Sequence, residues 1–239
     1  MAKPDVINAD EMGHAVGLLV HDLRNPAATI TANADFLQEV GLVDTDSVEA
    51  LQDVKLAVGE LRRGLDMLAW ISRWLTGHVP LEAANGDVGM FLERLERTDT
   101  PVPVTVEIAE RGHLYARGAQ VAVEVVDLLL HNTRANVADP SATVRVYRQG
   151  GDVVVEVEDA GEAMAPELRE AAFTLDGQKA LKGRLDGRYS RFIGLFAAAV
   201  VLDGVGGRIE ADGERGAAIF RVFLPEARPT RPPTRPPSR

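Results

Sequence analysis

Two apolar stripes in the first third of the chain constrain its fold more than any other feature. Within residues 9–77, apolar residues recur at alternating spacings of three and four, with an interruption near residues 41–45. The first stripe comprises Met12, Val16, Leu19, Leu23, Ile30 and Leu37, and the second comprises Leu51, Val54, Val58, Leu61, Leu65, Leu68 and Leu75. Such spacing is typical of a coiled-coil seam. It predicts two helices joined by a short turn.

A hairpin of two helices cannot bury both stripes by itself. A homodimer that packs two hairpins into a four-helix bundle is the simplest arrangement that covers them. We therefore expect residues 9–78 to form a dimerisation domain.

From about residue 85 onward, strand patterns alternate with helix patterns. Helices are expected at residues 88–96, 120–136 and 193–202, and strands at residues 102–108, 143–147, 153–157, 208–211 and 218–224. The Gln-Gly-Gly-Asp turn at residues 149–152 predicts one hairpin, and the last two strands form a second. This order indicates an α/β sandwich over residues 85–226, with helices on one face of a sheet. The chain as a whole is expected to be α+β.

Composition excludes several classes of function. The 239 residues contain no Cys, which excludes disulfide frameworks, thiol catalysis and Cys-ligated zinc. The net charge of -10 argues against a nucleic-acid partner. No apolar run approaches the roughly 18 residues of a membrane span, so we expect a cytoplasmic protein. Residues 227–239 are rich in Pro and Arg and are expected to be a disordered tail.

A histidine close to a proline stands out in the first helix. Residues 21–26 read His-Asp-Leu-Arg-Asn-Pro. At roughly 100° per residue, His21 lies about 160° around the helix from Leu19 and Leu23, which places its imidazole in solvent. Asp22 is suited to orient the ring tautomer or to take its proton. Pro26 lacks a backbone N–H and is expected to bend the helix.

This hexapeptide resembles the phosphoacceptor box of sensor histidine kinases, whose dimerisation domain is a helical hairpin. The resemblance covers roughly residues 9–226, and it includes a divergent ATP-binding domain of the GHKL type. It implies that His21 is the phosphoacceptor and that Asp22 bonds or deprotonates its ring. By the same resemblance, Asn25 positions water for dephosphorylation of the partner protein.

The helix expected at residues 120–136 resembles the family's helix that holds Mg²⁺ and phosphates. Residues 127–136 read Asp-Leu-Leu-Leu-His-Asn-Thr-Arg-Ala-Asn. The resemblance makes Asn132 the magnesium ligand, with Asp127 in place of an upstream Asn. Arg134 is suited to reach a phosphate, and Arg134 and Asn136 are further candidate nucleotide-binding residues of this segment.

Two further segments resemble the family's nucleotide site. Residues 159–163, Asp-Ala-Gly-Glu-Ala, are similar to Asp-x-Gly-x-Gly, which makes Asp159 the acceptor for the adenine amino group and Gly161 its neighbour in the site. Residues 190–195, Ser-Arg-Phe-Ile-Gly-Leu, align with Gly-x-Gly-Leu-Gly-Leu and keep one of its three glycines. Since backbone N–H groups at a helix N-terminus hold anions, Gly194 and Leu195 are candidate nucleotide-binding residues.

A basic segment precedes this box where the family has its ATP lid. Residues 176–191 contain five Lys or Arg side chains, and glycines that are expected to make the segment mobile. We expect Arg184 and Arg188 to bind the triphosphate and partly replace the missing glycine amides. A solvated basic loop is the alternative.

Together these resemblances imply a cytoplasmic, homodimeric histidine kinase of a two-component system. It would phosphorylate His21 from ATP with Mg²⁺, and pass the phosphoryl group to an Asp of a response regulator receiver domain in a phosphorelay. Since no sensor domain precedes residue 9, we expect the signal from a separate protein or a soluble ligand. Two alternatives are a phosphotransfer protein whose degenerate second domain does not use ATP, and a dimeric scaffold without chemistry.

Overall fold

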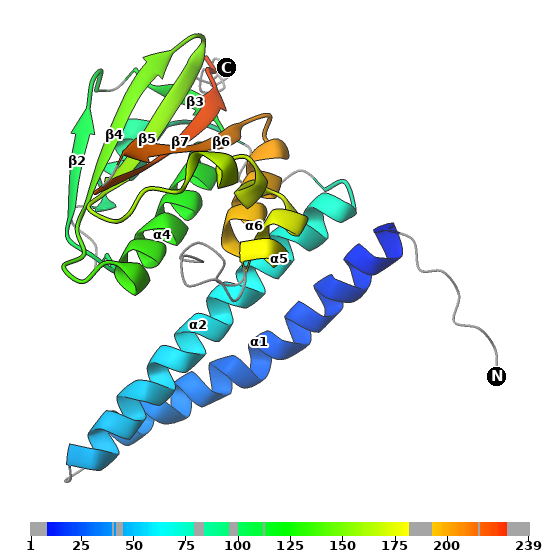
Figure 1. Cartoon of the computed structure of the whole chain (residues 1–239). Helices are drawn as coiled ribbons and strands as arrows, with labels where there is room; N and C mark the ends of the chain where they lie inside the picture. Colours follow the sequence, from blue (N-terminus) through cyan, green and yellow to red (C-terminus); the bar gives the residue numbers. More distant parts are fainter. Residues whose placement is uncertain are drawn as a thin grey trace, which may run out of the picture. The chain divides into compact units, whose positions relative to one another are not determined.

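The computed structural model describes residues 9–39, 41, 45–78, 84–95, 100–111, 113–181, 193–214 and 216–228. The chain divides into two compact units, Met1–His78 and Val79–Arg239. The first is a pair of helices, and the second combines strands with helices (Figure 1). Within the described ranges, no helix is long and apolar enough to cross a membrane.

The first unit is a helical hairpin, as the two stripes predict. Helices α1 (Ala9–Glu39) and α2 (Thr45–Leu75) pack along each other (Figure 1). After α1, Gly41 has a φ of 80°, a left-handed conformation that glycine adopts without the strain of a Cβ atom. Helix α1 continues through Pro26 without ending there.

Residues seven positions apart form the buried seam of the hairpin. On α1 they are Gly13, Val20, Ala27 and Ala34, and on α2 they are Leu51, Val58, Leu65 and Ser72. The α1 row is small, so the helices approach closely: a Cβ atom added to Gly13 would lie 2.8 Å from Cγ2 of Thr76. At this end Ser72 Oγ donates a 2.7 Å hydrogen bond to the Gly13 carbonyl.

The stripe predicted on the first helix is not the surface that packs against α2. Met12, Leu23, Ile30 and Leu37 are 38–45% exposed, and Val54 and Leu61 of the second stripe are each 43% exposed. Gly and Ala allow closer backbone contact than Leu and Ile, and the intrachain seam therefore follows the row of small residues. These six larger residues, here called the exposed stripe, are left on the surface of the single chain.

The second unit is built on a five-stranded sheet with strand order β2-β4-β5-β7-β6. Its strands are β2 (Val104–Ile108), β4 (Ala142–Gln149), β5 (Asp152–Asp159), β6 (Arg208–Glu214) and β7 (Ala217–Pro225). Strands β2 and β4 are parallel, and the other neighbours are antiparallel. Both predicted hairpins are present, and Gly150 and Gly151 take positive φ values of 62° and 93° in the first turn.

Helices α4 (Ala119–Asn136), α5 (Leu175–Leu181) and α6 (Gly194–Asp203) lie on one side of the sheet (Figure 1). The core between these layers is mostly Val, Leu and Ala. Helix α3 (Val88–Leu92) is shorter than the predicted helix at residues 88–96. Helix α5 was not expected, because residues from 176 onward were assigned to a mobile segment. A small sheet of β1 (Asn85–Asp87) and β3 (Tyr115–Arg117) was also not predicted.

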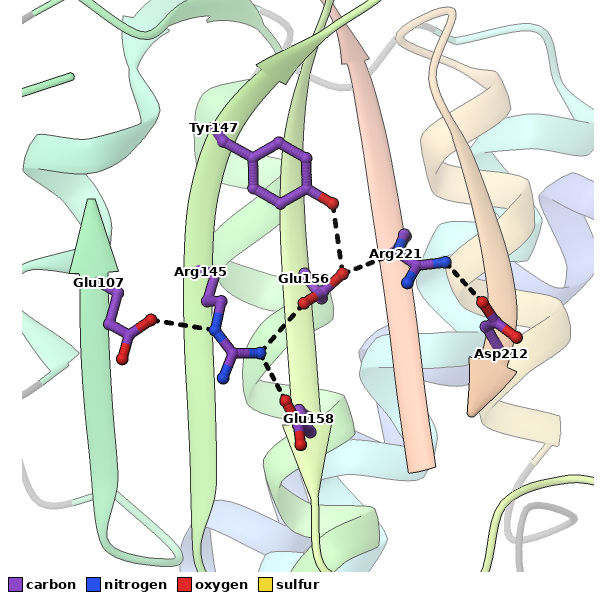
Figure 2. Close-up of polar contacts among 7 residues, drawn as sticks. All are labelled: Glu107, Arg145, Tyr147, Glu156, Glu158, Asp212 and Arg221. Atoms are coloured by element: carbon purple, nitrogen blue, oxygen red, sulfur yellow. Dashed lines mark hydrogen bonds and ion pairs between the residues drawn. The ribbon is translucent and has the colours of Figure 1, made fainter. Parts of the chain in front are cut away.

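The opposite face of the sheet is polar, with charges that alternate across the strands. Strand pairing aligns a single row across all five strands: Glu107, Arg145, Glu156, Arg221 and Glu210. Figure 2 shows the hydrogen bonds that connect four of these with Tyr147, Glu158 and Asp212. Burial alone would raise the pKa of Glu156, but hydrogen bonds from Arg221 and Arg145 outweigh it and lower that pKa. Opposite charges on facing strands favour this register.

Candidate functional site

His21 lies near the middle of α1, and its side chain is exposed as the helical geometry predicts. Less than one turn further along, Arg24 Nη2 donates to Oδ1 of Asp66 on α2 at 2.6 Å. The two side chains of this ion pair are 50% and 55% exposed. Such a pair contributes less than about 1 kcal/mol to stability, but it links the histidine-bearing helix to its neighbour.

Asn25 and Pro26 are also exposed on α1. The Asn25 carbonyl accepts a 3.1 Å hydrogen bond from Thr29 Oγ1. Pro26 has no N–H, so the Asp22 carbonyl lacks the donor that an α-helix supplies from four residues later. The side chain of Asp22 lies outside the described residues. The regular backbone bonding of α1 is therefore interrupted next to His21.

Asp159 ends strand β5 with a buried carboxylate, 7% exposed. Its Oδ2 accepts a 2.6 Å hydrogen bond from Thr133 Oγ1 on α4, and its Oδ1 accepts a 2.8 Å bond from the Gly161 N–H. Both oxygens are thus held in fixed directions by the chain itself. A buried carboxylate oriented in this way is suited to accept a further hydrogen bond from a polar ligand.

Thr133 was not singled out in the sequence, although it follows the candidate Asn132 directly. Its side chain is 1% exposed, and its hydroxyl also lies 3.2 Å from the Leu129 carbonyl. The available signal was a hydroxyl on the buried side of an otherwise apolar helix, since such a group requires a partner.

The polar residues of α4 do not all lie on one face. Asn132 is half-buried, and its backbone carbonyl accepts a 2.6 Å bond from Asn136 Nδ2 one turn later. Asp127 is exposed, and Nδ1 of His131 lies 2.9 Å from its backbone carbonyl oxygen and 3.5 Å from its carboxylate. Five residues of helix separate Asp127 from Asn132, a rotation of roughly 140°. The structure therefore brings Asn136 to Asn132 but does not bring Asp127 there.

Arg134 lies near the end of α4 with an exposed side chain. It belongs to the helix that carries Asn132 and Thr133, and a rotation of roughly 200° separates it from Asn132. Among the described residues, no three His, Asp or Glu side chains gather as a metal site.

The first turn of α6 contains the two candidate residues from the glycine-poor box. Gly194 begins the helix, and a Cβ atom there would lie 3.5 Å from Leu128, an ordinary contact. Leu195 is fully buried, so its side chain belongs to the core and only its backbone N–H is suited to meet an anion. Ile193, just before the helix, has a φ of 55°, which is strained for a β-branched residue.

The remaining candidates fall on parts of the chain that are not described. Arg184 and Arg188 lie within residues 182–192, and the predicted tail lies mostly within residues 229–239.

Comparison with known proteins identifies the second unit. Residues 116–228 match the family described as "Histidine kinase-, DNA gyrase B-, and HSP90-like ATPase". The matched residues make up most of the second unit, which is therefore similar to this family. The match contains α4 with Asn132 and Thr133, strand β5 with Asp159, and the start of α6. The polar cluster at Asp159 thus lies within the part of the chain that matches this family.

Two relatives match almost the whole chain. The sensor histidine kinase ZraS of Salmonella typhi is 24% identical over 223 residues, which are 90% of this chain and 46% of that protein. The crystal structure of full-length ShkA in complex with AMPPNP has a TM-score of 0.61 at 16% identity, and covers 91% of this chain and 47% of that chain. This chain therefore spans about half the length of either relative.

The resemblance to sensor histidine kinases with a GHKL-type ATP-binding domain is confirmed by these matches. The predicted α+β fold class, a helical hairpin followed by an α/β sandwich, is confirmed as well.

Proposed function

We propose that this protein is an ATP-dependent histidine kinase of a two-component system that phosphorylates its own His21. The observation that carries the proposal is the buried carboxylate of Asp159, held by Thr133 and Gly161 within a histidine kinase-type ATPase domain. The same chain carries His21 as an exposed side chain on a helical hairpin. One unit therefore supplies a nucleotide site, and the other supplies a nucleophile.

In the nucleotide site, Asp159 accepts a hydrogen bond from the adenine amino group, with Gly161 beside it. Asn132 and Asn136 on α4 face the phosphates, and the Gly194 and Leu195 N–H groups at the start of α6 hold phosphate oxygens. Arg134 lies on another side of α4, roughly 200° from Asn132, and so it has a weaker claim to the site. Arg184 and Arg188 add positive charge. Asp127 lies roughly 140° around α4 from Asn132, and so it also has a weaker claim to the site.

Mg²⁺ fits the chemistry of Asn132. This ion takes most of its ligands from nucleotide phosphates and water, and needs only one or two protein side chains. The amide oxygen of half-buried Asn132 is such a ligand. Mg²⁺ held there would neutralise charge on the phosphates while ATP reacts.

The reaction begins with Nε2 of His21, which attacks the γ-phosphorus of ATP in line. The N–P bond forms as the bond to the β,γ-bridging oxygen breaks, and ADP leaves with that electron pair. Asp22 bonds the Nδ1–H of the ring or accepts its proton. The exposed position of His21 lets the nucleotide site approach it, and afterwards lets an Asp of a response regulator receiver domain take the phosphoryl group. Asn25 positions water for dephosphorylation of that partner.

The exposed stripe on α1 and α2 supports a homodimer. Its six large apolar side chains are 38–45% exposed in the single chain. A second hairpin packed on this stripe would remove it from water and produce a four-helix bundle. We place the protein in the cytoplasm, where ATP and the receiver partner are available.

The test is phosphorylation with γ-labelled ATP and Mg²⁺. We expect label on the protein that is stable in base and labile in acid, as phosphohistidine is. His21→Gln should abolish the label, while His14→Gln, one heptad earlier on α1, should retain it. An absence of both label and nucleotide binding would contradict the proposal. If a phosphorylated receiver domain then labelled His21, the protein would be a phosphotransfer protein instead.

A further inference from the structure

The loop after Asp159 has no helix or strand from residue 160 to residue 165, although it begins at the proposed adenine acceptor. At its start the Gly161 N–H bonds the Asp159 carboxylate at 2.8 Å. Near its end the Met164 side chain is buried, 6% exposed. The Met164 carbonyl accepts a 3.1 Å hydrogen bond from Nε of Arg169. A side chain outside the loop therefore holds its far end.

Arg169 binds three acceptors with three different nitrogen atoms. Besides the Met164 carbonyl, it binds Asp212 Oδ1 through Nη1 at 2.8 Å and the Gly213 carbonyl through Nη2 at 2.7 Å. Asp212 and Gly213 both belong to strand β6. The planar guanidinium thus ties the loop to an edge strand of the sheet.

The loop also touches β6 directly. A Cβ atom added to Gly213 would lie 3.1 Å from Cβ of Ala163, and Gly213 has a φ of 118° that favours glycine. Ala163 therefore rests against the backbone of β6 at the position where Arg169 binds it. The loop is therefore held at two neighbouring points: Ala163 contacts the backbone of β6, and Arg169 binds the Met164 carbonyl.

The strand residue that anchors Arg169 is itself held in place. Asp212 Oδ2 accepts a 2.8 Å bond from Arg221, which also donates to the buried Glu156 at 2.7 Å. Figure 2 shows that this chain of bonds continues through Glu156 to Tyr147 and Arg145 on β4. The hydrogen bond from Arg221 lowers the pKa of Asp212. Arg169 is thus fastened to a charged network that spans the sheet.

We propose that Arg169 is a positioning residue for nucleotide binding: its guanidinium holds residues 160–165 against β6, and thereby keeps Asp159 and Gly161 in the geometry that receives adenine. This proposal rests on the proposed function. Arg169 acts through the loop and does not touch the nucleotide.

Arg221 offers a matched control within the same network. It shares the carboxylate of Asp212 with Arg169, but its other partner is Glu156 of the sheet rather than the loop. Arg169→Met and Arg221→Met each remove a guanidinium from Asp212. A purely structural role for Arg169 predicts the same change in nucleotide affinity for both variants.

The measurement is the dissociation constant of ADP for the full chain, by calorimetry with Mg²⁺. Arg169→Met removes all three hydrogen bonds that hold the loop against β6, so we expect it to weaken ADP binding about tenfold or more. Arg221→Met should change the affinity by less than about twofold, although both variants lower the melting temperature.

In labelling kinetics, Arg169→Met should raise KM for ATP and leave kcat unchanged. Arg169→Lys keeps the positive charge and a single donor nitrogen, so it should restore part of the affinity. It also carries the test if Arg169→Met does not fold.

A double-mutant cycle with Asp159→Asn tests whether Arg169 affects nucleotide binding through Asp159. If Arg169 acts through Asp159, Arg169→Met should cost little further affinity once Asp159 is changed. Equal losses in Arg169→Met and Arg221→Met, or additive losses in the cycle, would overturn the role of Arg169 and leave the kinase proposal intact. An unmodified protein that binds no ADP would overturn both.

Discussion

The hydroxyl of Thr133 lies 2.6 Å from Oδ2 of Asp159, and this hydrogen bond joins the last turns of α4 to the end of β5. Both side chains are buried, at 1% and 7% exposed. Asn132, the candidate magnesium ligand, is the residue before Thr133. In the function proposed above, these two adjacent residues serve different parts of the nucleotide: Thr133 holds the adenine acceptor Asp159, and Asn132 binds Mg²⁺ at the phosphates.

Thr133→Val should weaken nucleotide binding because it removes the hydroxyl and keeps nearly the same side-chain shape. One oxygen of the buried Asp159 carboxylate then loses its donor, at a cost of about 1–3 kcal/mol. Calorimetry with ADP should detect a corresponding loss of affinity, on the order of tenfold. Thr133→Ser retains the hydroxyl and should remain close to the original affinity. Equal affinity in Thr133→Val would show that this bond has no part in ligand binding.

Helix α4 also illustrates what the sequence could and could not predict. Its extent was predicted to within one residue, because the run from residue 121 onward is dense in Val and Leu and has helical periodicity. The β4–β5 hairpin was also predicted, from the glycines of its turn, although each strand extends up to two residues further than expected. The bond between Thr133 and Asp159 joins positions 26 residues apart. Local pattern carries no information about which side chains meet at that distance.

Helix α5 was missed for a related reason. Gly177 lies inside it, and glycine lowers helix propensity by about 1 kcal/mol relative to Ala. A Cβ atom there would fall 1.8 Å from the Ala171 carbonyl oxygen, so glycine is required by close packing against the preceding turn. In the sequence, Gly177 suggested a mobile segment. In the structure, glycine is needed there because a larger residue would not fit against residue 171. The displaced seam of α1 has the same origin, because the contact follows Gly and Ala rather than the largest apolar side chains.

Ile30→Glu should weaken self-association. Ile30 belongs to the exposed stripe and is 42% exposed, and a charge there would have to be buried in the proposed four-helix bundle. Leu56→Glu is the control, because Leu56 is 57% exposed and lies roughly 200° around α2 from the buried Val58. Sedimentation velocity should show a shift of Ile30→Glu toward monomer, and no such shift for Leu56→Glu. The opposite pattern would place the dimer contact on another face.

Two helical glycines in the hairpin should respond in opposite ways to alanine. At Gly59 a Cβ atom would meet only Nη1 of the flexible Arg63 at 3.7 Å. Gly59→Ala should therefore raise the free energy of unfolding of the hairpin by about 0.5–1 kcal/mol. At Gly13 the new atom would lie 2.8 Å from Thr76 and 3.0 Å from Leu75. Gly13→Ala should lower that free energy, since overpacking costs about 1–3 kcal/mol.

Urea unfolding followed by tryptophan fluorescence measures this difference. Trp70 and Trp74 both lie in α2, so the signal reports on the first unit. A similar gain in both variants would mean that the two helices are further apart at Gly13 than the structure places them.

The stability of the second unit should fall in acid because of Glu156. This carboxylate is 8% exposed and bonds Arg145, Arg221 and Tyr147. Burial raises the pKa of Glu156, but the hydrogen bonds from Arg221 and Arg145 lower it by a larger amount. Its pKa in the folded chain is therefore below the ordinary value of 4.5. A group with a lowered folded pKa contributes its full stability above its unfolded pKa. That contribution is lost as the pH falls through the folded value.

Glu156→Gln should therefore lower the free energy of unfolding of the second unit at pH 7 by about 1–3 kcal/mol. The difference should shrink as the pH drops below about 4.5, because the original carboxylate becomes protonated. Glu107→Gln is the control, because Glu107 lies at the end of the charged row, bonds Arg145 and has a side chain that is 57% exposed. This variant should change the free energy of unfolding by less than about 1 kcal/mol. Amide hydrogen exchange of peptides from β5 and β7, corrected for the intrinsic rate at each pH, measures these differences within the second unit. A gap between Glu156→Gln and the original protein that stays constant from pH 7 to pH 3 would contradict the lowered pKa of Glu156.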